Sequence, residues 1–91
     1  MIVLTIYSRP DCHLCDDMKA VVRRVMAGTG YGDREATTLV ETDISGNTEL
    51  EARYGLEVPV LLVNGKKAAK YRVTEEELVK RLEAERGNTQ G

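Results

Sequence analysis

Two cysteines lie where the sequence changes from a strand pattern to a helix pattern, and this junction constrains the fold more than any other feature. Residues 2–7 form a nearly continuous apolar run rich in β-branched residues, which is typical of a strand covered on both faces. A helix with one apolar stripe follows, made of Leu14, Met18, Val21, Val22, Val25 and Met26. The segment Cys12-His13-Leu14-Cys15 stands between the two patterns. The sequence therefore predicts a Cys-x-x-Cys pair at the start of a helix, directly after a buried strand.

The rest of the chain predicts a second strand and helix, then a hairpin and a final helix. The expected elements are a strand at 36–42, a short helix at 47–54, strands at 60–63 and 66–72, and a helix that begins at Thr74. Asn64-Gly65 predicts a tight turn between the last two strands, because a type I′ turn needs positive φ at both central residues. Thr74 and Glu77 have the spacing of a capping box. The order β-α-β-α-β-β-α predicts an α/β protein with a four-stranded mixed sheet and three helices.

Length and composition are typical of one small globular domain. The chain has 91 residues, of which 42% are hydrophobic, so we expect a domain at 1–86 and a flexible polar tail at 87–91. No apolar run approaches the roughly 20 residues of a membrane helix. The net charge of −2 gives no reason to expect a nucleic-acid partner. The first strand begins next to Met1 and leaves no room for a secretory signal, so a cytoplasmic protein is expected.

The position of the cysteine pair favours thiol–disulfide exchange. In a reducing compartment, a close cysteine pair is more often catalytic or metal-binding than structural. A helix N-terminus stabilises a thiolate through its free N–H groups and the positive end of the helix dipole. The apolar stripe begins at Leu14, so we expect Cys12 to be exposed and Cys15 to be turned inward. An exposed thiol can attack a disulfide and a shielded one can resolve the mixed disulfide, so both cysteines are predicted catalytic residues.

Some charged neighbours of this pair favour a thiolate, and others oppose it. Arg9, three residues before Cys12, favours the thiolate, and His13 does so when it is protonated, which makes His13 a candidate for tuning the pair. Three acidic residues oppose them: Asp11, Asp16 and Asp17. A zinc site needs four ligands, and only His13 stands beside the cysteines, so no metal site is predicted. An iron–sulfur cluster shared between two chains, with ligands from outside, stays open.

Three segments, in this order, resemble those of glutaredoxin-like proteins of the thioredoxin-fold superfamily. Residues 7–15 (YSRPDCHLC) resemble the active-site segment, with Arg9 at its basic position. Val58-Pro59 resembles the Val-Pro that precedes the third strand, and residues 63–66 (VNGK) resemble the hairpin that follows it. The resemblance covers nearly the whole chain and implies a thioredoxin-like fold.

The same resemblance implies a role for each candidate residue. Cys12 would attack a disulfide of a protein or a small molecule, and Cys15 would release the reduced product. Arg9, Val58 and Pro59 would bind the substrate: Pro59 would be cis, and the backbone of Val58 would pair with the substrate beside Cys12. We expect a monomer and no bound cofactor.

Two departures from the glutaredoxin pattern leave the electron donor open. Glutaredoxins usually have Cys-Pro-Tyr-Cys, whereas His13-Leu14 stands between the cysteines here. They also usually have Gly-Gly and an acidic residue after the hairpin, which hold glutathione, whereas the comparable positions here lie near Ala69 and Lys70. The donor is therefore glutathione or a protein of the thioredoxin-reductase type. The alternative to an enzyme is a binding module that uses the same fold for docking, or a carrier of a metal or an iron–sulfur cluster.

Overall fold

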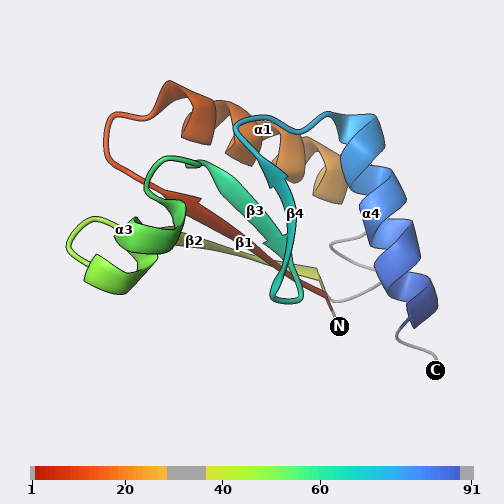
Figure 1. Cartoon of the computed structure of the whole chain (residues 1–91). Helices are drawn as coiled ribbons and strands as arrows, with labels where there is room; N and C mark the ends of the chain where they lie inside the picture. Colours follow the sequence, from red (N-terminus) through yellow and green to blue (C-terminus); the bar gives the residue numbers. More distant parts are fainter. Residues whose placement is uncertain (1, 29–36, 89–91) are drawn as a thin grey trace.

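The strand β1 (Ile2–Ser8) leads through a short loop into α1 (His13–Gly28), and this unit carries both cysteines. The computed structural model describes residues 2–28 and 37–88 (Figure 1). The other elements in these ranges are β2 (Thr37–Asp43), α3 (Thr48–Tyr54), β3 (Val60–Val63), β4 (Lys66–Lys70) and α4 (Glu75–Asn88). The predicted order β-α-β-α-β-β-α is thus confirmed for the described part of the chain.

The four strands form one mixed sheet in the order β2-β1-β3-β4. β2 is parallel to β1, whereas β3 is antiparallel to both β1 and β4. Val60, the first residue of β3, pairs with Tyr7 near the end of β1 and with Lys70 at the end of β4. The loop that leads to Cys12 and the segments that flank Val60 and Lys70 therefore lie at the same end of the sheet.

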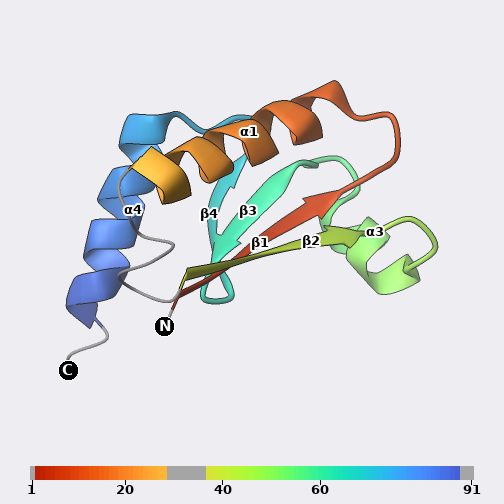
Figure 2. The same cartoon turned by 180° about the vertical axis from the view of Figure 1, so that it is seen from behind.

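One face of the sheet is covered by α1 and α4, which pack against each other, as Figures 1 and 2 show from opposite sides. Side chains of a strand point alternately to its two faces, so every second residue of β1 enters the core on this side. The members of the hydrophobic core are Ile2, Leu4, Ile6, Met18, Val22, Val25, Leu61, Val63, Leu78 and Leu82. Tyr7 points to the other face, where its ring centroid lies 4.9 Å from that of Tyr54 in α3. The sheet thus has helices on both faces.

Local signals in the sequence set the starts of two helices. The hydroxyl Oγ1 of Thr74 accepts a hydrogen bond from the amide of Glu77 at 3.1 Å, and Oε1 of Glu77 accepts one from the amide of Thr74 at 3.0 Å. This reciprocal pair is the predicted capping box. Asn47, expected as the first residue of a helix, is the N-cap of α3, because its Oδ1 accepts a hydrogen bond from the amide of Leu50 at 3.0 Å.

Several element bounds differ from those expected, most of them by one residue. β4 ends at Lys70 rather than at residue 72, because Tyr71 has a left-handed backbone with φ of +68° that cannot continue a strand. α4 continues to Asn88 and includes the first two residues of the expected tail, while residues 89–91 of that tail lie outside the described residues. Residue 36, the expected start of the second strand, also lies outside them. Within residues 2–28 and 37–88, no helix has the length and apolar character needed to cross a membrane.

Candidate active site

The two cysteines lie at the junction between the loop after β1 and the first turn of α1. Asp11 turns the chain just before them with φ of +58°, a left-handed conformation that Asp adopts more readily than most residues. Cys12 and Cys15 are joined by a disulfide, and their Cα atoms are 5.2 Å apart, within the usual range for such a bridge. The strand-to-helix junction predicted for this pair is confirmed.

The surroundings of the two sulfurs differ. Cys15 is only 2% exposed, whereas Cys12 is half-buried at the edge of the loop. The amide of Cys15 donates a hydrogen bond to Sγ of Cys12 over 3.1 Å. A free amide at a helix N-terminus stabilises negative charge on such a sulfur, which favours the thiolate when the disulfide is reduced. The arrangement therefore suits Cys12 as the attacking thiolate and Cys15 as the shielded partner.

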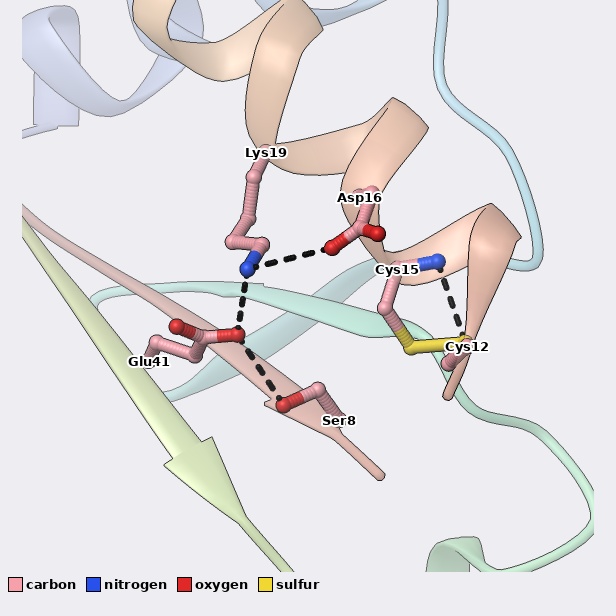
Figure 3. A network of polar contacts seen from close by, with 6 residues as sticks. All are labelled: Ser8, Cys12, Cys15, Asp16, Lys19 and Glu41. Carbon is pink, nitrogen blue, oxygen red and sulfur yellow. Dashed lines mark hydrogen bonds and ion pairs between the residues drawn. A yellow bond between two sulfur atoms is a disulfide. The ribbon is translucent and has the colours of Figure 1, made fainter. Parts of the chain in front are cut away.

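A polar network lies beside the disulfide, and sequence reasoning missed it (Figure 3). Nζ of Lys19 is 2.8 Å from Oε2 of Glu41 on β2 and 3.3 Å from Oδ1 of Asp16. The hydroxyl of Ser8, on β1, donates to the same oxygen of Glu41 at 3.3 Å. Lys19 follows Cys15 by four residues, so it lies on the same side of α1, one turn further along.

Neighbouring carboxylates stabilise the protonated, charged form of Lys19. Its hydrogen bond to Glu41 raises the pKa of the ammonium group above its ordinary value of 10.5, and the contact with Asp16 acts in the same direction against the effect of burial. The periodicity of α1 could have placed Lys19 near Cys15. The partner Glu41 could not have been found, because it depends on the register of β2 against β1.

Arg9 and His13 are the two charged candidates proposed from the sequence. Arg9 forms an ion pair with α3, whereas His13 is exposed. The guanidinium Nη2 of Arg9 is 2.9 Å from Oε1 of Glu51 in α3, so this cation ties the loop before Cys12 to α3. Arg9 also lines a pocket of about 290 Å³ with Ser8, Pro10, Glu41 and Asp43. His13 is exposed as the first residue of α1.

The Val58-Pro59 segment lies at the end of the sheet to which the cysteine loop also leads. The peptide bond between the two residues is cis, as the resemblance implies. Pro59 is buried and Val58 half-buried. The carbonyl of Pro59 accepts a hydrogen bond from the amide of Tyr71 at 2.8 Å. Tyr71 therefore belongs to the surroundings of the site, although no sequence signal pointed to it.

A second pocket separates α1 from the connection between β4 and α4. It has a volume of about 330 Å³ and is lined by Asp17, Met18, Val21, Tyr71, Arg72, Val73 and Thr74. Its wall on α1 begins two residues after Cys15. In the part of the chain that the structure describes, no three His, Cys, Asp or Glu side chains are grouped to hold a metal ion.

The fold and the cysteine pair define the class: a glutaredoxin-like protein with a thioredoxin fold and a Cys-x-x-Cys pair at a helix N-terminus. Comparison with protein families also assigns the chain to a glutaredoxin-like family. Residues 3–83 match the model of the family described as "Glutaredoxin-like domain (DUF836)", and the chain belongs to this family.

Solved structures extend this comparison. The Northeast Structural Genomics target protein XcR50 from X. campestris is 32% identical, with a TM-score of 0.71 over 89% of this chain and 96% of that one. Thioredoxin-2, a component of the malaria parasite protein secretion machinery, has a TM-score of 0.64 at 18% identity over 92% of this chain and 82% of its own. A mutant thioredoxin from Halobacterium salinarum NRC-1 has a TM-score of 0.57 at 21% identity, over 91% of this chain and 73% of its own. The two thioredoxins support the fold alone.

Proposed function

We propose that the protein is a thiol–disulfide oxidoreductase that reduces disulfides of proteins or small molecules with Cys12 and Cys15. The observation that carries this proposal is the asymmetry of the pair. Cys12 is half-buried and its sulfur accepts the amide of Cys15, whereas Cys15 itself is 2% exposed. A reactive cysteine is expected in a partly exposed site that stabilises the thiolate, and a resolving cysteine is expected in a shielded one.

The reaction follows from these positions. In the reduced protein, the thiolate of Cys12 attacks one sulfur of the substrate disulfide, forms a mixed disulfide with it and releases the other sulfur as a thiolate. Cys15 then loses its proton and attacks Sγ of Cys12, which expels the second substrate thiolate. Both released thiolates take up protons. The substrate gains two electrons, and the protein ends with the Cys12–Cys15 disulfide, the oxidised state in which the pair is found here.

Residues around the pair support binding of an extended substrate. Within the described residues, the backbone amide and carbonyl of Val58 take part in no backbone hydrogen bond. Free backbone groups beside a reactive sulfur can pair with an extended chain, as an added strand does. Arg9 joins the loop before Cys12 to α3 through Glu51, and in this proposal the exposed His13 tunes the charge near the pair.

The electron donor in this proposal is glutathione or a protein of the thioredoxin-reductase type. Glutaredoxins usually hold glutathione with Gly-Gly and an acidic residue. Here the comparable part of the chain is the end of β4, with Ala69 half-buried and Lys70 exposed. This favours a protein donor. The reaction is expected in the cytoplasm, where such donors keep thiols reduced.

Serine variants of the two cysteines test the proposed roles. Cys12→Ser should abolish disulfide reduction, because the attacking thiolate is lost. Cys15→Ser should retain the first attack and accumulate a mixed disulfide on Cys12, which intact-mass spectrometry detects after incubation with a disulfide substrate. The proposal fails if Cys12→Ser keeps wild-type activity, or if Cys15→Ser forms no adduct. Stoichiometric metal in the purified wild-type protein, together with no turnover, would support the carrier alternative instead.

A further inference from the structure

Tyr71 has a backbone conformation that its residue type rarely adopts. Its φ of +68° lies in the left-handed region, where the Cβ of an L-residue comes too close to the following carbonyl oxygen and where glycine is unstrained. A bulky residue persists there only when surrounding contacts hold it, and such positions gather at functional sites. The side chain of Tyr71 is therefore expected to contribute something that an unstrained glycine would not.

Two hydrogen bonds connect Tyr71 to the segment at 56–59. Its amide donates to the carbonyl of Pro59 at 2.8 Å, at one end of the segment. Its hydroxyl donates to the carbonyl of Leu56 at 2.9 Å, at the other end. A glycine could supply only the first of these bonds. Tyr71 thus holds the segment on both sides of Val58, with its backbone amide at Pro59 and its side-chain hydroxyl at Leu56.

The strand register places this contact at the end of the sheet to which the cysteine loop also leads. Tyr71 follows Lys70, which pairs with Val60, and Val60 pairs with Tyr7 shortly before the loop to Cys12. Tyr71 also lines the pocket of about 330 Å³ whose other wall is α1, beginning two residues after Cys15. Tyr71 remains 43% exposed and Leu56 is 93% exposed, so both offer apolar surface at this end of the sheet.

We propose that Tyr71 is a positioning residue that makes the site select disulfides in extended polypeptide segments over small disulfides. This inference rests on the proposed oxidoreductase function. By holding 56–59, Tyr71 keeps the backbone of Val58 available for pairing with the substrate chain, and its exposed ring contacts the apolar side chains of that chain. A small disulfide has no backbone to pair with Val58 and gains little from this arrangement.

The test compares two substrates in wild type, Tyr71→Phe and Tyr71→Gly, with dithiothreitol as the electron source. Insulin supplies a polypeptide disulfide, and bis(2-hydroxyethyl) disulfide supplies a small one. Tyr71→Phe removes only the hydroxyl, so the ratio of kcat/KM for insulin to kcat/KM for the small disulfide should fall roughly two- to tenfold, the effect of one lost hydrogen bond. Tyr71→Gly should lower the ratio further. In both variants the change should come from KM for insulin, and the reduction potential of the pair should keep its wild-type value.

The control variant for this experiment is Val40→Ala. Val40 lies on the outer strand β2 and is 42% exposed, nearly as much as Tyr71, so Val40→Ala should leave the ratio unchanged. If Tyr71→Gly fails to fold, Tyr71→Phe alone tests the role of Tyr71, because this variant keeps the aromatic ring and loses only the hydroxyl. A ratio equal to that of wild type in the folded variants overturns the role of Tyr71 while leaving the oxidoreductase function intact. A wild-type protein that reduces neither substrate overturns both.

Discussion

Lys19 shows how a single side chain sets the charge beside the buried cysteine. It lies one helical turn after Cys15 and forms ion pairs with Glu41 and Asp16, with only 20% of its side chain exposed. The ion pair with Glu41 crosses from α1 to the outer strand β2, so it also joins two elements that are far apart in the sequence. Its contribution to stability should therefore depend on the protonation of Lys19.

The pH dependence of this contribution has a defined sign. The pKa of Lys19 is raised in the folded protein, chiefly by Glu41, so its stabilising effect is fully present below the unfolded value of 10.5 and is lost as pH rises through the folded pKa. Lys19→Gln should lower the midpoint of thermal unfolding at pH 7, and the difference from wild type should shrink above pH 10.5. Circular dichroism melts from pH 7 to strongly alkaline pH measure this difference.

The control for this prediction is Lys80→Gln. Lys80 contacts Glu76 at 3.6 Å, and both side chains are more than three-quarters exposed, so this pair should contribute almost nothing. A Lys19→Gln protein that melts at the same temperature as Lys80→Gln across the whole pH range would contradict the role given to the network.

At the level of elements, the end of α3 meets the loop that carries the cysteines. Gly55 follows α3, and a Cβ at this position would lie 2.5 Å from the carbonyl oxygen of Glu51 and 2.7 Å from Nη2 of Arg9. The Arg9 side chain can move, but the carbonyl oxygen is part of the last turn of α3 and accepts the amide of Gly55. A close approach that only glycine allows therefore helps to join α3 to the loop before Cys12.

Gly55→Ala should accordingly destabilise the protein, by about 1–3 kcal/mol of unfolding free energy as for other overpacked sites. Gly28→Ala is the matched control, because a Cβ there meets nothing within 4 Å among the described residues and its backbone is not left-handed. Urea denaturation of the two variants measures the difference. Equal unfolding free energies for both would show that the contact at Gly55 is readily relieved.

Several elements could be predicted because their signals are local in the sequence. Asn64 and Gly65 have φ of +50° and +82°, the positive values that the predicted turn requires at both positions. The capping box of Thr74 and Glu77 is likewise formed by residues only three apart. The cysteine pair could be placed because a strand pattern and a helix pattern meet at it.

Other features depend on contacts that sequence patterns do not contain. The pairs Lys19–Glu41 and Arg9–Glu51 each join segments brought together by the sheet and by α3. The sequence Lys70-Tyr71-Arg72 has no turn residue, so a strand was expected to continue through it, whereas tertiary hydrogen bonds hold Tyr71 in a left-handed turn. Sequence reasoning therefore named Val58 and Pro59 near the cysteines, but it missed Tyr71 and the partners of Lys19 and Arg9.

At the scale of the whole molecule, the fold brings a shielded and a half-exposed cysteine to one end of a mixed sheet, and the central claim is that they form a reversible redox pair. The direct test is the intact mass of the protein after anaerobic equilibration in a series of glutathione redox buffers. The account predicts that wild type converts between a dithiol and a form two hydrogens lighter, and that Cys12→Ser and Cys15→Ser never show the lighter form. Thiols that stay reduced in wild type across the whole series would contradict it.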